Sequence, residues 1–329
     1  MNDAISIGSP LLWAGFLSFV FIMLALDLFV FGAGKAHKVS VKEAAGWSIG
    51  WFAMAIAFNA GLWWHLTGTL GSEIADQKAL EFFTGYLIEK SLSVDNVFIF
   101  LLIFSAFAVP PEYQRRVLIY GVLGAIVMRI IMILLGSWVV QEFKWILYIF
   151  GAFLLFTGIK MLWASDSAQD MNENWLVKWA RKHIRITPQL HGEKFTVRQE
   201  GVLYFTPLFL VLILVEVSDL VFAVDSIPAI FAITTDPFIV ATSNIFAILG
   251  LRALYFLLAD MAERFHLLKY GLAVVLAFIG TKLLITPWFH MPIALSLGFV
   301  VVVISLSIVA SLWVTRKQAN AKTAPSHQA

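Results

Sequence analysis

Long apolar runs separated by short polar segments dominate the chain. About 20 predominantly apolar residues suffice for a helix to cross the hydrocarbon core of a bilayer. Nine runs of roughly this length occur, at Leu12–Phe31, Ala45–Trp64, Leu80–Ala108, Val117–Val140, Trp145–Ala164, Tyr204–Ile233, Phe238–Ala259, Leu268–Thr286 and Ile293–Val314. The pattern predicts an all-α membrane protein with nine transmembrane helices.

Basic residues alternate along the connections between these runs. The first, third, fifth and seventh connections and the segment after the ninth run are rich in Lys and Arg, whereas the other connections hold only Lys78 and Lys144. Loops rich in Lys and Arg stay in the cytoplasm. We therefore expect a bacterial inner-membrane protein with its N-terminus outside and its C-terminus in the cytoplasm.

The predicted spans form one polytopic transmembrane domain over residues 1–316. The one long connection, 165–203, is expected in the cytoplasm. Trp175 and Trp179 share a helical face in it, with Lys178 and Lys182 beside them, which favours a helix lying on the membrane surface. An ordinary solvated linker helix is the alternative. Residues 317–329 are polar and are predicted to be a disordered cytoplasmic tail.

Composition agrees with a bilayer environment and narrows the function classes. The chain is 60% hydrophobic and 13% charged, with mean hydropathy +0.86, whereas soluble domains are about 45–50% apolar and about 25% charged. No basic face indicates nucleic-acid binding. The absence of cysteine excludes disulfides, thiolate metal sites and Cys nucleophiles. No nucleotide-binding loop and no nucleophile–His constellation is found, so the sequence favours neither an ATP-driven pump nor an enzyme.

A repeat is visible in the positions of the charges. Asp95, Arg129 and Lys160 follow one another at intervals of 34 and 31 residues. Asp219, Arg252 and Lys282 follow one another at intervals of 33 and 30, so the two series have equivalent positions. The units, 80–164 (spans 3–5) and 204–286 (spans 6–8), each contain three spans and so cross the membrane in opposite directions. Such inverted repeats are typical of secondary transporters. A second register, which pairs Asp95 with Asp225, remains open.

Ionisable residues inside the spans indicate a functional site. Each costs about 2.5–3.5 kcal/mol near the bilayer centre. Arg129, Arg252 and Lys90 are predicted to form structural ion pairs, but the acids outnumber these bases by three: Asp27, Glu89, Asp95, Glu216, Asp219 and Asp225. Purely structural pairing is the alternative and does not explain this excess. A divalent cation, protons, or both would neutralise it.

The available ligand atoms are almost all oxygens. Carboxylates, Asn96 and several serines lie in the spans, and no histidine lies at mid-span. Such sites suit manganese, magnesium and calcium rather than zinc or copper, and the residues alone do not separate the first three. Pro228 removes a helical bond close to Asp225. A kink or unwound turn there would redirect this carboxylate.

Two segments carry a resemblance to a known family. IEKSLSVDNVF (88–98) and VEVSDLVFAVDSIPAIFAIT (215–234) resemble the TerC family of integral membrane proteins, particularly its Alx-type members, as does Asp27 in its context. The family takes its name from tellurite resistance, and the resemblance implies manganese export. It also implies a metal pathway along Glu89, Asp95, Glu216, Asp219 and Asp225, with Asp27 and Asn96 as further candidates.

Together these features predict a secondary transporter that exports a divalent metal ion, with manganese as its substrate and no permanently bound cofactor. Desolvation favours protonated carboxylates and a bound cation expels the protons, so proton coupling is expected. We expect Asp95, Glu216 and Asp219 at the deepest point, with Glu89 and Asp225 further out. A membrane scaffold of a stress response is the alternative, and an intramembrane enzyme ranks below both. The sequence does not fix the oligomeric state.

Overall fold

The computed structural model describes residues 6–32, 40–143, 145–163, 178–179, 182–259, 267–286, 288–289 and 291–323. The named helices are α1 (Pro10–Gly32), α2 (Val41–Leu70), α3 (Ser72–Ala106), α4 (Pro111–Glu142), α5 (Ile146–Trp163), α7 (Pro207–Phe231), α8 (Pro237–Leu249), α9 (Leu251–Ala259), α10 (Leu268–Ile285) and α11 (Ile293–Thr323). Strands β1 (Thr196–Gln199) and β2 (Val202–Phe205) form a small antiparallel hairpin. The described part of the chain is therefore almost entirely α-helical.

Several helices are long and apolar enough to cross a membrane. Five meet this condition by length and composition within the described residues: Val41–Leu70, Pro111–Glu142, Pro207–Phe231, Pro237–Ala259 and Ala294–Val314. Shorter apolar helical stretches cover Pro10–Leu26, Ile146–Leu162 and Tyr270–Ile285. A chain with this many apolar helices fits a membrane location.

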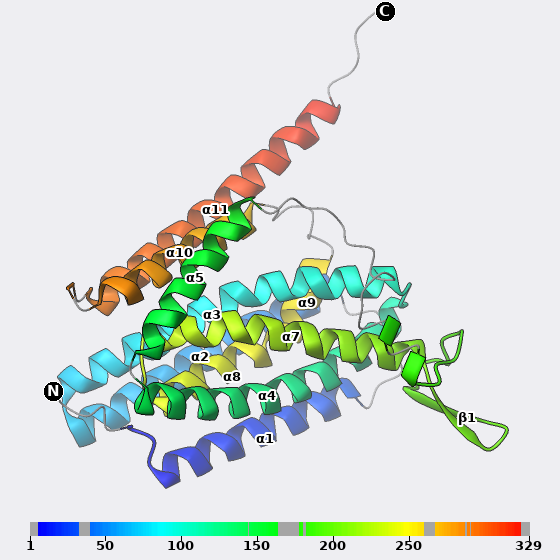
Figure 1. Cartoon of the computed structure of the whole chain (residues 1–329), viewed down its shortest axis with the longest axis horizontal. Coiled ribbons are helices and arrows are strands. Elements are labelled where there is room, and N and C mark those ends of the chain that lie inside the picture. The colour runs from blue at the N-terminus through cyan, green and yellow to red at the C-terminus, as the bar shows by residue number, and fades with distance from the viewer. Residues whose placement is uncertain are drawn as a thin grey trace, which may run out of the picture.

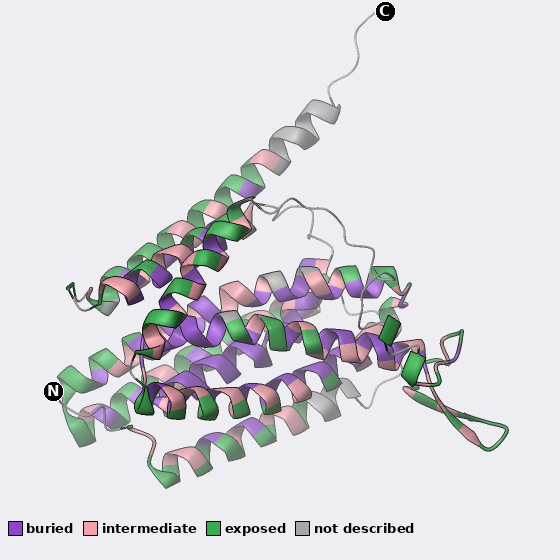
Figure 2. Cartoon of the chain, in the orientation of Figure 1, coloured by how far each residue is buried: buried purple, intermediate pink, exposed green. Residues whose placement is uncertain are grey.

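The helices form a bundle with two directions of packing. Figure 1 shows α1, α3, α4 and α7 running along the long axis, while α5, α10 and α11 cross this group obliquely. Helix α3 packs against α2, α7 and α8, and α5 packs closely along α10. Buried residues concentrate on the faces that α3, α7 and α8 turn toward one another, and α11 is largely exposed (Figure 2).

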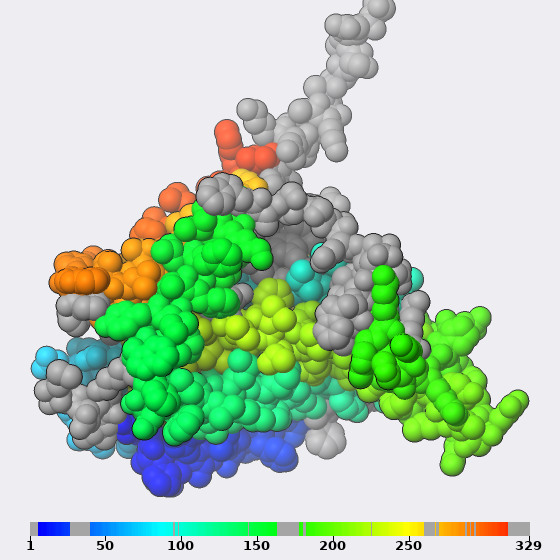
Figure 3. Space-filling view, viewed as in Figure 1, coloured from blue at the N-terminus to red at the C-terminus, as the bar shows by residue number. Residues whose placement is uncertain are grey.

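The two ends of the bundle are distinct. At one end, here called the hairpin end, the β-hairpin packs beside the start of α4, where Arg116 lies 5.3 Å from the ring centre of Phe195. This hairpin projects from the molecule in Figure 3. At the other end, here called the N-terminal end, Ser6 and Ile7 contact Asp236 in the connection between α7 and α8.

The seventh predicted span is divided into two helices. Pro237 begins α8 and Asp236 caps it by accepting from the backbone N–H of Phe238 at 3.0 Å. The α-helix is interrupted at Gly250, which separates α8 from α9. The predicted span Phe238–Ala259 still corresponds to one segment long and apolar enough to cross a membrane, Pro237–Ala259, with this interruption inside it. Glycine weakens a helix interior, and a lysine from α3 fills the space beside this residue, as described below.

Three other local features bear on the expectations from the sequence. Tyr204 lies in β2, so the sixth span begins as α7 at Pro207. Helix α7 continues through Pro228 to Phe231 without the unwound turn considered from the sequence, because one lost backbone bond leaves the flanking turns intact. Helix α11 extends to Thr323, into the segment predicted to be disordered. Its Arg, Lys, Gln and Ala residues are strong helix formers.

The structure describes only part of the long connection between α5 and α7. The predicted surface helix around Trp175 falls mostly outside the described residues. Trp179 is half-exposed and its ring stacks on His183 at 4.9 Å. The hairpin after it was not expected from the sequence.

Candidate cation site

Arg129 of α4 lies at the centre of a buried cluster of charges. The residue is 1% exposed. Its Nε and Nη2 donate to the two carboxylate oxygens of Asp219 on α7, at 3.2 and 3.1 Å. Its Nη1 donates to Oε1 of Glu89 on α3. Charge-assisted bonds of this forked kind are among the strongest in proteins, so one guanidinium joins three helices.

Two buried amides complete the hydrogen bonding of this cluster. Asn244 of α8 accepts from Nη1 of Arg129 at 3.1 Å and donates to Oε2 of Glu89 at 3.2 Å. Asn96 of α3 donates to Oδ1 of Asp219 at 3.1 Å. Each of the four oxygens of the two carboxylates therefore has a donor. We refer to these five residues as the Arg129 cluster.

A small cavity adjoins the Arg129 cluster. It has a volume of about 40 Å³ and is lined by Glu89, Asn96, Arg129 and Ser226 together with apolar side chains from α3, α5, α7 and α10. A water molecule needs roughly 10–15 Å³, so the cavity has room for about two or three waters or for one ion. Oδ1 of Asn96 is buried and has no hydrogen-bond partner among the described residues. The cavity therefore offers an oxygen ligand that is not otherwise used.

Glu216 lies on α7, one turn before Asp219, and faces α4. It packs against Gly124, where a Cβ atom would overlap the carboxylate. Glycine at this position thus makes the room that Glu216 occupies. The carboxylate makes no hydrogen bond or ion pair with the residues that the structure describes, and it is not among the ligands around Arg129.

Three predicted site residues cannot be placed by their side chains. The backbones of Asp27, Asp95 and Asp225 lie in α1, α3 and α7, but their side chains fall outside the described part of the chain. Among the residues searched, which are the described ones, no three His, Asp or Glu side chains converge as a metal site would require. The described structure thus brings Glu89, Asn96 and Asp219 together, places Glu216 against α4 outside the hydrogen bonds of Arg129, and does not test Asp27, Asp95 and Asp225.

Lys90 was expected in an ion pair, and its described contact is of another kind. Its ammonium donates to the backbone carbonyl of Ala247 at 3.3 Å, at the C-terminal end of α8. A Cβ on Gly250 would lie 2.5 Å from this ammonium. A cation at a helix C-terminus is favoured by the exposed carbonyls and by the helix dipole. Lys90 therefore caps the interruption between α8 and α9.

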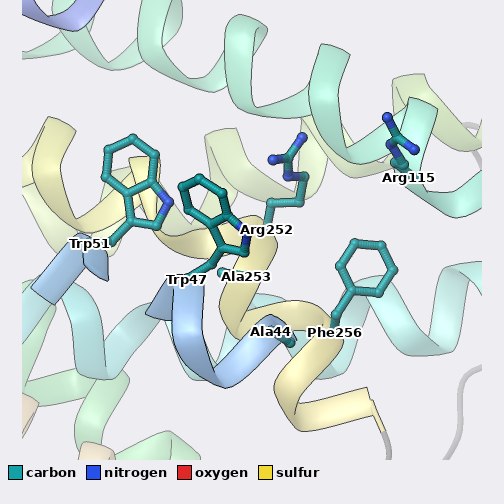
Figure 4. Close-up of a pocket in the computed structure, with 7 residues that line it drawn as sticks. All are labelled: Ala44, Trp47, Trp51, Arg115, Arg252, Ala253 and Phe256. Atoms are coloured by element: carbon teal, nitrogen blue, oxygen red, sulfur yellow. The ribbon is translucent and has the colours of Figure 1, made fainter. Parts of the chain in front are cut away.

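Arg252, the counterpart of Arg129 in the proposed repeat, occupies a different environment. It is 7% exposed and lines a cavity of about 10 Å³ with Trp47 and Trp51 of α2 and Arg115 of α4. Figure 4 shows Arg252 extending from α9 beside the two indole rings, with Arg115 on a separate helix, α4.

A second cluster of buried charges lies at the N-terminal end, and no sequence pattern singled it out. Lys78 of α3 lies 2.8 Å from Glu81 and 3.6 Å from Asp236. Glu81 also accepts from Thr234 at 2.6 Å and from Gln77 at 2.8 Å. We call Lys78, Glu81, Thr234 and Asp236 the end cluster. Its members sit at the borders of predicted spans, where polar residues are ordinary.

Asn244 was also missed. The helix around it contains apolar and hydroxyl residues, and Asn244 is the one amide side chain of α8. An isolated amide in a buried apolar helix is costly unless it is hydrogen-bonded. The cost of burying this amide was the signal in the sequence that could have pointed to Asn244, but it does not identify the residues to which Asn244 is hydrogen-bonded.

Comparisons with known proteins agree on one family. A model described as "Integral membrane protein TerC family" matches residues 74–319. A Salmonella typhi protein, Alx, named for a proposed role as a membrane-bound redox modulator, is 58% identical over 95% of this chain and 97% of its own length. The Escherichia coli K12 protein of the same name is 59% identical over 94% of this chain and 96% of its own. An uncharacterised membrane protein of Myxococcus xanthus is 50% identical over 93% of both. No solved structure matches the chain.

Proposed function

Because the chain belongs to the TerC family of integral membrane proteins, we propose that it is a secondary transporter that exports a divalent cation, manganese, in exchange for protons. The observation that carries this proposal is the Arg129 cluster, in which two buried carboxylates share one guanidinium beside a polar cavity.

Charge balance supports a cationic substrate. Glu89 and Asp219 carry two negative charges and Arg129 carries one positive charge, which leaves one negative charge in a site that is about 1–3% exposed. An uncompensated buried charge is strongly unfavourable. If Asp95 and Asp225 approach the same cavity, as we propose, the excess of negative charge grows and a divalent cation becomes the natural counter-ion.

Ligand chemistry supports a hard cation. The groups that line the cavity are carboxylate, amide and hydroxyl oxygens, which suit manganese, magnesium and calcium. We choose manganese from the resemblance of the two motif segments to the family. The same carboxylates would take up protons when the metal leaves, which provides the exchange.

The packing of α5 on α10 supports an inverted repeat with nine spans. A Cβ on Gly158 would lie 2.6 Å from the carbonyl oxygen of Ala273 and from the amide nitrogen of Ala277. Gly280 is the equivalent of Gly158 in the second repeat, and a Cβ on it would lie against the backbone of Gly151 and Leu155. Gly151 and Leu155 are in turn the equivalents of Ala273 and Ala277. The contact is therefore reciprocal, as a two-fold axis between antiparallel repeats would require.

The placement of basic residues supports an orientation in the bacterial inner membrane. The connections at the hairpin end are the ones rich in Lys and Arg, including Arg115, Arg116, Lys194 and Arg198. We therefore propose that the hairpin end faces the cytoplasm and the N-terminal end faces outward.

A second candidate function comes from the names of the relatives. A redox modulator without cysteine cannot act through thiol chemistry, and this chain has none. A scaffold of a stress response would use the buried charges for assembly alone. Both alternatives predict no metal flux through the purified protein.

The test is manganese efflux from proteoliposomes of known internal pH, with three variants: Glu89→Gln, Asp219→Asn and Asp95→Asn. Each substitution keeps the side-chain volume and removes one negative charge, so we expect efflux to fall to background while the protein remains in the membrane. Asp76→Asn, at an exposed carboxylate that accepts from Trp63, is the control and should transport normally. Wild-type efflux in all three site variants would reject the proposed site, and no efflux from the wild type would reject the function.

A further inference from the structure

The end cluster and the Arg129 cluster are linked through α3 and α8. Glu81 and Glu89 both lie on α3, and Asp236 caps the helix that carries Asn244. In each case the two residues are eight positions apart, which is about 12 Å along a helix at a rise of 1.5 Å per residue. The end cluster therefore covers the seam between α3 and α8 on the N-terminal side of the Arg129 cluster.

The seam between the two clusters is tightly closed. A Cβ on Gly85 of α3 would lie 2.9 Å from Oγ of Ser243 on α8. Both residues are buried. Movement of a cation along this seam requires the N-terminal parts of α3 and α8 to separate.

The end cluster is built to hold these two parts together. The side chains of Glu81 and Asp236 are 4% and 1% exposed, and the ammonium of Lys78 lies between them. Ser6 and Ile7 donate to the two oxygens of Asp236, both at 3.0 Å, which fastens the segment before α1 over the same point. Two acids balanced by one lysine would repel each other if the lysine moved away.

We propose that Lys78, Glu81 and Asp236 form the gate through which the cation passes between the Arg129 cluster and the N-terminal end. This inference rests on the proposed transport function. Opening separates Lys78 from the two carboxylates, and the passing cation neutralises them in its place. Closing restores the ion pairs, so the site is sealed from this side while it is loaded from the other.

Cross-linking tests whether the seam must open. In the double variant Gly85→Cys/Ser243→Cys the two Cβ atoms start 3.4 Å apart, close to the roughly 3.5–4.5 Å of a disulfide. The chain has no other cysteine. We expect oxidation to lower manganese efflux by about tenfold or more, as for other closures that must open to release a substrate, and reduction to restore it. Undiminished efflux from fully oxidised protein would overturn the gate. Failure of wild-type efflux in the same vesicles would instead reject the transport function.

Accessibility provides a second test that needs no disulfide. Position 85 lies behind the gate. A membrane-impermeant maleimide added at the N-terminal end should therefore react slowly with the thiol introduced by Gly85→Cys. Lys78→Met removes the only described positive charge between Glu81 and Asp236, and we expect labelling to become several-fold faster. Lys78→Arg keeps the charge and should restore slow labelling. Equal rates in all three backgrounds would show that Lys78 does not hold the path closed.

Discussion

At the scale of single residues, the Arg129 cluster shows how a bilayer protein accommodates charges in its interior. Glu89 and Asp219 are almost fully buried, and every carboxylate oxygen is matched by an N–H donor from Arg129, Asn96 or Asn244. Burying a charge is tolerated when it is both paired and hydrogen-bonded. The cluster meets both conditions and still retains one excess negative charge.

Replacing Arg129 should be much more costly than replacing Arg116, a partly exposed arginine of the same helix. Arg129→Ala leaves two buried carboxylates unpaired, so we expect a loss of about 3–5 kcal/mol in the free energy of unfolding. Arg116, whose pair with Glu193 is 3.9 Å long and more than one third exposed, is the matched control. Arg116→Ala should cost about 0–1 kcal/mol. Thermal unfolding in detergent measures both, and equal losses would contradict the structural importance of the cluster.

Asn244 gives a finer prediction. Asn244→Leu keeps a similar volume but removes the donor to Glu89 and the acceptor for Arg129. Leaving buried polar groups without partners costs about 1–3 kcal/mol. We expect destabilisation in this range and a raised KM for manganese, because Glu89 loses its orientation. Asn59→Leu, which removes one partly buried amide hydrogen bond to the carbonyl of Ala79, is the control and should leave KM unchanged.

The residues of the two clusters differ in how readily they could be predicted from the sequence. Glu89, Asp219 and Arg129 stand out because a charge in an apolar run is rare and expensive. Asn244 carries no charge and its partners are 155 and 115 positions away. Lys78, Glu81 and Asp236 lie at span borders, where ionisable residues are expected in any membrane protein. Their meeting depends on the packing of α3 against α8, which no local pattern encodes.

At the scale of helices, α5 and α10 pack most closely among the helices that the structure describes. Gly158 and Gly280 lie against the backbone of the opposite helix, with hypothetical Cβ distances of 2.5–2.6 Å to main-chain atoms. Small residues at such crossings let membrane helices approach closely. The two positions are equivalent in the proposed repeat, so their substitutions should have similar effects.

Gly158→Leu and Gly280→Leu should each destabilise the protein. Backbone atoms cannot move aside as flexible side chains do, so we expect losses at or above the usual overpacking cost of about 1–3 kcal/mol. Gly298→Leu in α11 meets no atom within 4 Å and should be nearly neutral. The melting temperatures of the three variants provide the measurement. A neutral result at Gly158 or Gly280 would contradict the close crossing.

Most helices could be anticipated from apolar length, and the departures have local causes. The break between α8 and α9 depends on Gly250 and on a lysine from α3 that fills the adjacent space, which periodicity does not show. The β-hairpin depends on the turn at Glu200 and Gly201, both with positive φ, in a segment too polar to resemble a buried strand. Continuity of α7 through Pro228 depends on the stability of the turns on either side.

At the scale of the whole molecule, the distribution of basic residues predicts a topology that can be tested directly. Reporter fusions after residue 329 should be active in the cytoplasm, and fusions at the connection between α2 and α3 should be active outside. The physical reason is the concentration of Lys and Arg at the hairpin end. A C-terminal fusion active only outside would reverse the proposed orientation and, with it, the direction in which the gate faces.

The charges of α3 have a consequence for how the protein is made. Helix α3 is absent from the described helices that qualify as membrane spans by hydropathy, because its interior carries ionisable residues. Its counter-charge, Arg129, and its amide partner, Asn244, belong to α4 and α8 and leave the ribosome later. While the chain is being synthesised, α3 therefore enters the lipid without the groups that make its burial favourable. We expect its insertion to be completed only after the later helices arrive, so the order of biosynthesis and the order of assembly differ.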